Sequence, residues 1–411
     1  TLTLEDCLKI ASKQNPQLAT AREKKNELVA DYEAARSKFF PRLSLVSYYS
    51  RLDPDRLGPG GTTNQKLYSQ ESLNSLTGKQ IMFDGLKTYF STKAAQMGTE
   101  AQKEEIHRVA FDVEFSVTEA YYRLVEARED LNVAKEALRQ RQEFVKLTEA
   151  FFKAGKVTKL DFFRAQSQVF EAEQSAVEGE NAVRLAQIIL AQTLGVKEDF
   201  PIEISGKVRQ EFPPVSGFET LWQQAGAQNP EIKKLDIELS QGKSLIKAAQ
   251  GNYYPEISLQ GEAGVRHRNQ GGTEDEWIGG IFMEFPFFEG GLTRANVGKA
   301  TSQYLQTVET KRSRLDALRV DLRDAFNGLE NSRKGVSTAR QSIITNTEGY
   351  NSSLSLYRHG KATGLDVLQT QVELTASQFS FIRYAVAYEI NLSRIKKIIG
   401  TETPPFLLTN H

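Results

Sequence analysis

The sequence of 411 residues predicts a mainly α-helical protein with a small β part, made of two copies of one structural unit. Three observations predict this fold class: short motifs recur in the second half of the chain, two long stretches have coiled-coil periodicity, and short alternating segments lie between the helical ones. The predicted repeats span 1–208 and 209–411, each ordered as helix, two strands, long helix and helix. They exceed the solenoid periods of about 20–50 residues, so we expect two copies side by side, related by a pseudo-twofold axis.

The recurring motifs keep an offset of 205 residues over most of the chain and of 214 residues near its start. The matching pairs are Asn15-Pro16 with Asn229-Pro230, Phe83-Asp84-Gly85 with Phe288-Glu289-Gly290, Gly155-Lys156 with Gly360-Lys361, and Leu160-Asp161 with Leu365-Asp366. The change in offset places one insertion in the first copy, between Pro41 and Phe83.

Two proline-free stretches, from Leu86 to Phe152 and from Leu292 to Tyr357, carry apolar residues at heptad spacing. A step that alternates between three and four residues is the seam of a coiled coil. The clearest seams are Val113, Val117, Ala120, Leu124, Ala127, Leu131, Ala134 and Leu138 in the first copy and Leu318, Leu322, Ala325 and Leu329 in the second. Each stretch is therefore predicted to be one helix of about 67 residues, near 100 Å at about 1.5 Å per residue.

Four shorter helices are predicted at Pro16–Phe40, Thr158–Leu194, Pro230–Tyr254 and Ala362–Ile399. In each copy the two shorter helices together nearly match the length of the long one. We therefore expect them to stack end to end and to run antiparallel to it. Asn followed by Pro is a favoured helix start, because Asn caps the first turn and Pro tolerates the first helical position.

The strand signals lie at about 42–52, 67–83, 256–267 and 276–287, and the third is the clearest because apolar and polar residues alternate along it. Each strand is about as long as a tilted strand that crosses a bilayer. Aromatic residues gather at the ends near the helices, as an interfacial girdle requires. They are Phe39, Phe40, Tyr253, Tyr254, Phe285, Phe287 and Phe288. The alternative is a pair of solvent-facing hairpins that cap a helical bundle.

Four strands cannot close a membrane barrel, because known membrane barrels have at least eight. Open edges would then pair with other copies of the chain. If the strands enter a membrane, the chain must form a homo-oligomer, and three copies would give 12 strands.

Composition and motifs exclude several other classes of protein. The 52 basic and 52 acidic residues balance, which argues against a nucleic-acid-binding surface, and no uncharged apolar run is long enough for a membrane-spanning helix. The four histidines are scattered, and no Walker, GxSxG or GxGxxG motif occurs. Glu-x-x-His occurs once, at Glu104–His107, and not as the pair of motifs that a di-iron helical bundle needs, so we expect no enzyme, cofactor or metal site. The single Cys7 is predicted to be a buried apolar side chain. No signal peptide is visible at Thr1. If the numbering begins at the mature residue, this observation does not indicate whether the protein is exported.

The duplicated motifs, taken in their order along the chain, resemble those of the TolC-like outer-membrane efflux channel family. The resemblance covers the whole chain and implies a homotrimer in the outer membrane of a Gram-negative cell, extending into the periplasm. A 12-stranded transmembrane β-barrel would continue into an α-helical barrel, with equatorial segments at about 196–218 and 400–411. It implies a passive exit duct of a tripartite efflux pump or type I secretion system. The partners would be outer-membrane lipid, a periplasmic adaptor (membrane fusion) protein and an inner-membrane transporter. Whether the substrate is a drug, a metal or a protein is open.

The resemblance places Asp161 and Asp366 just past the turns at the periplasmic tip, where a ring of carboxylates would constrict the channel. The alternative is a helix cap, because an acidic residue in the first turn complements the helix dipole. For Asp366 both roles, gate residue and helix cap, remain possible. For Asp161 the helix cap is favoured. Where the best-known member of that family has a second Asp and a basic partner, this chain has Gln369 and Ala362. The closed state would then involve Tyr357, Arg358 or Lys361.

The same resemblance assigns an adaptor contact to the two tip turns, at Gly155, Lys156, Gly360 and Lys361. The alternative for these residues is a solvated loop. For the whole chain, the alternative function is a soluble periplasmic coiled-coil scaffold without a membrane barrel.

Overall fold

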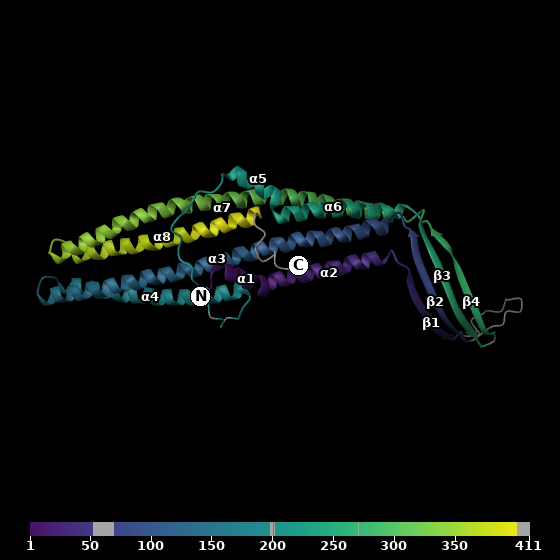
Figure 1. Ribbon diagram of the computed structural model, residues 1–411, viewed down its shortest axis with the longest axis horizontal. Helices are drawn as coiled ribbons and strands as arrows, with labels where there is room; N and C mark the ends of the chain where they lie inside the picture. The colour runs from purple at the N-terminus through teal and green to yellow at the C-terminus, as the bar shows by residue number, and fades with distance from the viewer. Residues whose placement is uncertain (52–69, 198–199, 201, 270, 401–411) are drawn as a thin grey trace. The chain divides into compact units, whose positions relative to one another are not determined.

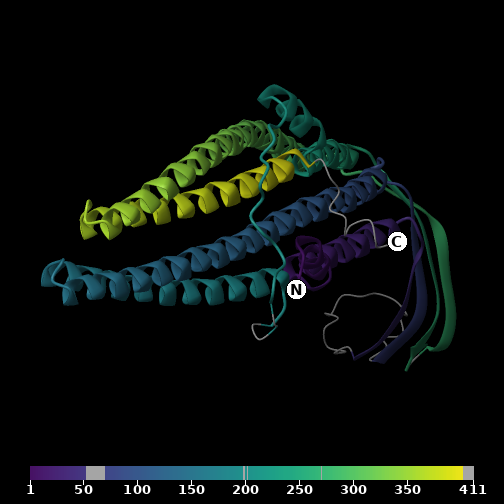
Figure 2. The ribbon, with the colours of Figure 1, turned by 60° about the vertical axis from the view of Figure 1, so that its left-hand side comes forward.

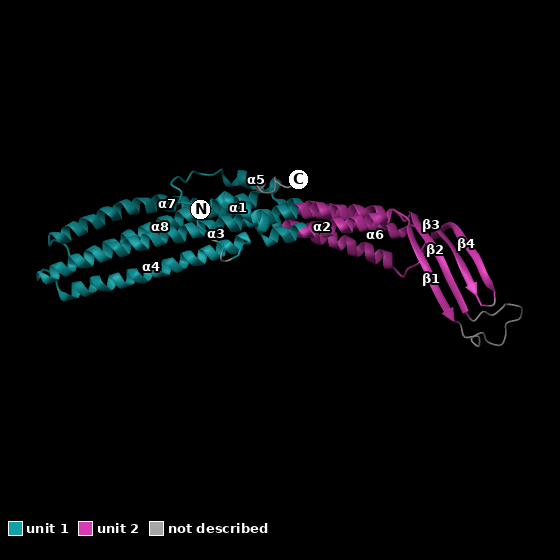
Figure 3. Ribbon diagram, turned by 60° about the horizontal axis from the view of Figure 1, so that its bottom comes forward, with its two compact units in different colours: residues 1–22, 104–233, 313–411 teal, residues 23–103, 234–312 magenta. Residues whose placement is uncertain are grey.

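The computed structural model describes residues 1–51, 70–197, 200, 202–269 and 271–400, and the chain divides into two compact units (Figures 1 and 3). Unit 1 comprises residues 1–22, 104–233 and 313–411, and unit 2 comprises residues 23–103 and 234–312. Both units draw on both halves of the sequence. The described residues are mainly helical with a four-stranded sheet, which confirms the predicted fold class.

The two long helices are α3 (Lys87–Lys153) and α7 (Leu292–Arg358), each of 67 residues. They confirm the prediction from the heptad seams. Most of the seam residues are buried because they face neighbouring helices: Val117 and Leu124 of α3 and Leu322 and Ala325 of α7 have no exposed surface, whereas Leu131 and Leu138 are half-buried. In unit 1, α3 runs beside α4 (Lys159–Leu194) and α7 beside α8 (Gly364–Ile399) (Figure 2). Among the described residues, no helix has a stretch apolar enough to cross a membrane.

The shorter helices before the strands end earlier than the sequence predicts. The first, α2 (Pro16–Ser37), gives way to a tight turn in which Phe39 N–H and Phe40 N–H donate to carbonyls three residues back, both at 3.0 Å. The next residue is Pro41, which disfavours helical geometry in the residue before it. In the second copy, α6 (Pro230–Gln250) ends in a 3₁₀ turn (Gly251–Tyr253) for the same reason, since Pro255 follows.

Two short helices lie outside the four predicted helix ranges. They are α1 (Leu4–Gln14), where the helical spacing of Leu4, Cys7, Leu8 and Ala11 indicated a helix, and α5 (Phe218–Gln228). The α1 helix brings Cys7 into the apolar core of unit 1, together with Leu18, Val117 and Leu190. Cys7 is fully buried, as predicted, and this burial raises the pKa of its thiol to about 11. The thiolate form is therefore scarce, and Cys7 acts as a small apolar side chain.

Two asparagines join the shorter helices end to end. Asn15 Nδ2 donates to the carbonyl oxygen of Thr193 at the end of α4 (2.9 Å), and its Oδ1 accepts from Gln17 N–H at the start of α2 (2.9 Å). Asn229 repeats this arrangement: its Nδ2 donates to Ile398 of α8 (2.8 Å) and its Oδ1 accepts from Glu231 N–H of α6 (2.9 Å). The predicted caps are confirmed, and each also satisfies a carbonyl of the helix that ends there.

The helices beside these joints end at glycines. Gly195 and Gly400 have φ of 79° and 71°, the left-handed conformation of a helix C-cap. A Cβ atom on Gly195 would lie 2.4 Å from the carbonyl oxygen of Gln14, so a larger residue would push the two helix ends apart.

Between α4 and α5, residues 202–217 form an extended segment that we call the strap. Side chains from helices of unit 1 hold its backbone carbonyls. Arg128 Nη1 of α3 donates to Ile204 (2.5 Å), and Gln187 Nε2 of α4 donates to Ile202 (3.0 Å). Tyr388 Oη of α8 donates to Pro213 (2.6 Å). The strap therefore ties helices of the first copy to helices of the second.

The four strands of unit 2 are β1 (Arg42–Arg51), β2 (Gln70–Phe83), β3 (Glu256–Arg268) and β4 (Gly272–Glu284), antiparallel and in the order β1-β2-β3-β4 (Figure 1). Residues 52 and 67–69, at the edges of the predicted first hairpin, lie outside the described residues.

Only β4 is clearly displaced from its predicted range of 276–287. It starts earlier because Glu274 and Glu276, which resemble turn residues in the sequence, pair with arginines of β3. It ends earlier because Pro286 has no N–H to continue the ladder.

Candidate functional site

The sheet has two chemically different faces, which the strand register assigns directly. Leu45 of β1 lies opposite Leu76 of β2, which lies opposite Ala263 of β3 and, in turn, Trp277 of β4. Directly opposite residues point to the same side of a sheet. One apolar row therefore crosses all four strands.

The apolar face is also the exposed one. Leu45 is 78% exposed, Trp277 82% and Ile281 76%. The large exposed apolar residues on this face are Leu43, Leu45, Tyr49, Leu76, Leu259, Val265, Trp277, Ile281 and Met283. A soluble protein rarely exposes a contiguous apolar patch of this kind, and such patches mark protein or membrane contacts. An exposed apolar face opposite a polar one is the pattern of a strand in an outer membrane.

The opposite face carries most of the charged side chains of the sheet, together with a few apolar ones such as Ile278 and Phe282. A network of ion pairs and hydrogen bonds on this face crosses all four strands and centres on Glu71, which is only 4% exposed. Its members are Tyr48, Glu71, Arg266, Arg268, Glu274 and Glu276. Tyr48 Oη donates to Glu71 Oε1 at 2.6 Å, and Arg266 pairs with Glu71 and with Glu276 (2.5 Å). A buried carboxylate is costly unless it is paired, and Glu71 is paired with Arg266 and Arg268 on this face.

The two turns at the far ends of the long helices have the same geometry. Gly155 and Gly360 both have φ of 70°, and the following Lys156 and Lys361 donate their N–H groups to carbonyls five residues back, at 2.8 and 2.9 Å. This is the Schellman arrangement. A Cβ atom at either glycine would meet nothing within 4 Å, so the backbone conformation alone requires glycine here.

Asp161 and Asp366 follow these turns and act as helix caps within the chain. Asp366 Oδ2 accepts from Thr363 N–H (2.8 Å) and Thr363 Oγ1 (2.7 Å), and Thr363 Oγ1 in turn accepts from Asp366 N–H (3.3 Å). Asp161 makes the same capping box with Thr158. The hydrogen bonds from Thr363 lower the pKa of Asp366 below its ordinary value, so the carboxylate is ionised at neutral pH.

The other residues that the resemblance places at the tip differ in their exposure to solvent. Gln369 and Lys361 are exposed, and Gln369 Nε2 donates to Glu373 Oε1 at 3.2 Å. Tyr357, in contrast, is 3% exposed and lies against two residues of α3: its ring centroid is 5.1 Å from that of Phe144 and 5.5 Å from that of Phe151. Its Oη donates to Thr148 Oγ1 (3.3 Å). Tyr357 therefore joins the α7 end to α3 rather than facing solvent.

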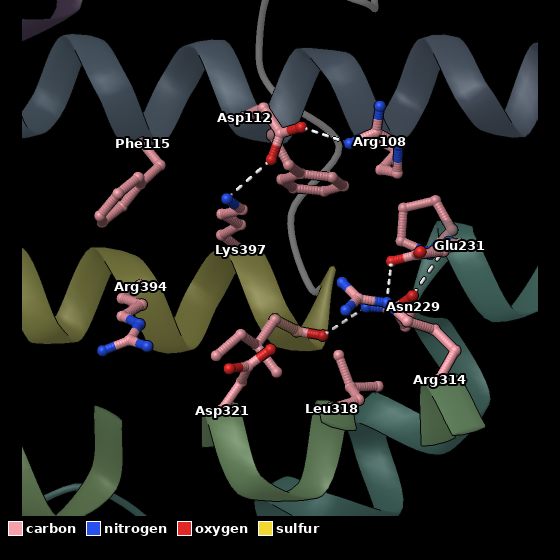
Figure 4. A pocket seen from close by; sticks show the side chains of 13 residues that line it. Arg108, Asp112, Phe115, Asn229, Glu231, Arg314, Leu318, Asp321, Arg394 and Lys397 are labelled. Atoms are coloured by element: carbon pink, nitrogen blue, oxygen red, sulfur yellow. Dashed lines mark hydrogen bonds and ion pairs between the residues drawn. The ribbon is translucent and has the colours of Figure 1, made fainter. Parts of the chain in front are cut away.

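A charged pocket of about 300 Å³ lies in unit 1, lined by residues of α3, α6, α7 and α8 (Figure 4). Figure 4 shows Asp112 between Arg108 and Lys397, with oxygen–nitrogen distances of 2.5 and 2.7 Å, and Glu231 beside Arg314. These charges neutralise one another across the helices, so the pocket works as a packed ionic contact. No group of three or more potential metal ligands occurs in the part of the chain that the structure describes.

The duplicated long helices and the two-faced sheet define the class of outer-membrane channels that carry a helical extension. Comparison with known proteins agrees: the model of the outer membrane efflux protein family matches residues 7–196 and 221–401. The chain belongs to the outer membrane efflux protein family. It is an outer-membrane channel protein that extends into the periplasm.

Similar proteins support this assignment. The chain is 22% identical over 385 residues to the outer membrane efflux protein BepC of Brucella suis, covering 93% of this chain and 81% of that protein. It is 22% identical over 380 residues to nodulation protein T of Rhizobium leguminosarum bv. trifolii, covering 90% and 79%. The fold is similar to that of the outer membrane protein VceC of Vibrio cholerae, with a TM-score of 0.83, 17% identity and coverage of 97% and 96%. The CmeC channel of Campylobacter jejuni gives a TM-score of 0.84 at 19% identity, covering 97% and 85%.

Proposed function

We propose that this outer-membrane protein is the passive exit duct of a tripartite efflux pump or of a type I secretion system, working as a homotrimer without a catalytic step. The observation that carries the proposal is the two-faced sheet. Its apolar face suits lipid, its charged face suits a water-filled lumen, and its outer strands, β1 and β4, each lack a partner on one side among the described residues. The alternative, a soluble periplasmic scaffold, leaves the exposed apolar face unexplained.

The open edges support assembly from three chains. Unpaired strand edges favour pairing with another copy, and a membrane barrel needs at least eight strands. Three copies bring 12 strands, and β4 of one copy would pair with β1 of the next. The predicted equatorial segment at about 196–218, which contains the strap, would form one part of the equatorial domain. The second predicted equatorial segment, 400–411, lies outside the described residues except for Gly400.

The tip turns are the proposed contact with the periplasmic adaptor protein, through which the channel would meet an inner-membrane transporter. Gly155 and Gly360 leave the turn surface open for a partner backbone. Lys156 Nζ lies over the Phe151 ring, 5.4 Å from its centroid, whereas Lys361 makes neither an ion pair nor a cation–π contact with the described residues. We therefore expect Lys361 to give the more charge-sensitive contact of the two.

In a trimer, Asp366 would form a ring of three carboxylates at the tip. Two substitutions test its charge and its role as a helix cap separately. Asp366→Asn keeps a side-chain acceptor for Thr363 but removes the charge, so it should raise the anion permeability of single channels if the ring constricts the pore. Thr363→Ala weakens the cap but keeps the carboxylate, so it should leave ion selectivity unchanged. Asp161→Asn, in the matching capping box of the first copy, is the control. Equal selectivity in all three variants would reduce Asp366 to a cap.

The first test of the proposed function is the protein mass of the detergent-solubilised particle. The protein is extracted in mild detergent, and light scattering with refractive-index and absorbance detection separates the protein mass from the bound detergent. We expect a protein mass of three times 46.1 kDa together with a substantial detergent mass. A monomer or dimer that binds no detergent would exclude the channel and favour the scaffold.

A further inference from the structure

A second pocket of unit 1, of about 470 Å³, lies between α7 and the strap. Its helical wall carries three cations, Arg333, Lys334 and Arg340, and its strap wall includes Glu211 and Phe212. We call this pocket the strap groove. Three positive charges face one negative charge there, which is unusual in a chain whose formal net charge is zero.

Only one of the three cations is matched by a carboxylate within the described residues. Arg333 Nη2 donates to Glu330 Oε2 at 3.0 Å, while its Nε is buried without a hydrogen-bond partner. Arg340 Nη2 donates to a neutral acceptor, the carbonyl oxygen of Gln210, at 2.7 Å. Lys334 is exposed and makes no ion pair with any described residue. The strap groove therefore keeps an excess of positive charge.

The first copy of the repeat shows how the same positions look when they are neutralised. At the offset of 205 residues, Lys334 corresponds to Glu129, an acidic residue. Arg333 corresponds to Arg128, whose Nη1 already donates to the strap carbonyl of Ile204. The charge reversal at one position thus distinguishes the second copy from the first.

A second difference between the copies points the same way. Arg340 corresponds to Lys135, whose Nζ lies 2.9 Å from Glu180 Oε1. That ion pair lowers the pKa of Glu180. The position that corresponds to Glu180 is Ala385, a buried residue without charge. The second copy therefore lacks the acidic partner as well as carrying the extra lysine.

We propose that the strap groove binds an extended acidic segment of a partner protein, an interaction that goes beyond the channel function. From Arg333 to Arg340 the helix advances by seven residue steps, about 10 Å at about 1.5 Å per residue. Carboxylates on alternate residues of an extended peptide lie about 7 Å apart, so two or three of them match this spread. A single phosphate group is too small to reach all three cations. Phe212 adds an apolar surface beside the charges.

The test uses the full chain in detergent and a fluorescein-labelled peptide of alternating glutamate and glycine, followed by fluorescence anisotropy. We expect saturable binding that weakens as the salt concentration rises. Lys334→Glu, which installs the residue of the first copy, should weaken binding at least about five-fold, because it replaces attraction by like-charge repulsion. Lys334 is exposed, so the substitution should leave the fold intact.

The matched control is Lys135→Gln, which removes a lysine at the equivalent surface of the first copy and should leave peptide affinity unchanged. A peptide with glutamine in place of glutamate should not bind. The proposal is overturned if the unmodified protein shows no saturable binding or if Lys334→Glu binds the peptide equally well. It is also overturned if inorganic phosphate displaces the peptide at concentrations near the affinity of the peptide itself, since that would indicate a site for compact anions.

Discussion

Leu76→Arg should destabilise the membrane-inserted protein by about 2–4 kcal/mol per copy, the cost of an arginine on the lipid side of a barrel strand near the bilayer midplane. Leu76 lies near the middle of β2, is 53% exposed, and belongs to the apolar row that crosses the sheet. The measurement is the unfolding midpoint in denaturant of protein reconstituted in liposomes, together with the amount of protein recovered in the outer-membrane fraction.

The control is Thr77→Arg, one residue further along the same strand. Thr77 lies on the charged face, opposite Ser44 and Glu262, so an arginine there would point into the polar side and find a carboxylate across the ladder. We expect this variant to assemble normally with a small change in stability. If both arginines were tolerated alike, neither face of the sheet would contact lipid, and the membrane function assigned to the strands would fail.

Tyr357→Ala should cost about 3 kcal/mol of stability and raise the single-channel conductance in planar bilayers. Removing a buried aromatic ring leaves a cavity, and changes of this size typically cost about 3–5 kcal/mol. The ring packs between Phe144 and Phe151, so its loss weakens the contact that holds the end of α7 against α3. If the tip is the constriction, a weaker contact favours the open state.

Two variants separate the packing of Tyr357 from its hydroxyl and from general damage to the tip. Tyr357→Phe keeps the ring and should cost only about 0.5–1.5 kcal/mol, because Thr148 Oγ1 still donates to the Phe144 carbonyl at 2.9 Å. Phe152→Ala changes the corresponding residue of the first copy, which is 37% exposed. That variant should leave the conductance unchanged. A conductance that is the same for Tyr357→Ala and the unmodified channel would remove Tyr357 from the gate.

The elements with strong local signals could be predicted from the sequence. The long helices end within one residue of the predicted bounds, because a heptad seam without proline leaves little choice of structure. The caps at Asn15 and Asn229 were also predictable, since an Asn-Pro pair starts a helix by local geometry. The carbonyl groups that their side-chain amides meet come from helices about 170 residues away, and no local pattern reveals them.

The first hairpin was harder to predict for an identifiable reason. Its alternation looks imperfect because Tyr48, an aromatic residue, lies on the charged face. Its hydroxyl bonds to Glu71 of β2, so the polar end of the side chain decides the face. At the proposed tip, Tyr357 and Asp366 were predicted as gate residues from the resemblance, but their contacts were not predicted. The capping box is local, whereas the pocket for Tyr357 is built from α3, 209 residues away in the chain.

The asparagine joints also affect how this chain tolerates insertions. Adding one residue to a continuous helix turns everything beyond it by about 100°, which would move a whole heptad seam out of contact. In α3 and α7 such a change would disturb every later contact of the helix. At Asn15 the end of α4 meets the start of α2, and at Asn229 the end of α8 meets the start of α6. The backbone does not run from one helix of either pair directly into the other, and the asparagine side chain bonds to both. Evolution could therefore lengthen or shorten α4 and α8 without rotating α2 and α6, whereas the two long helices must keep their register throughout.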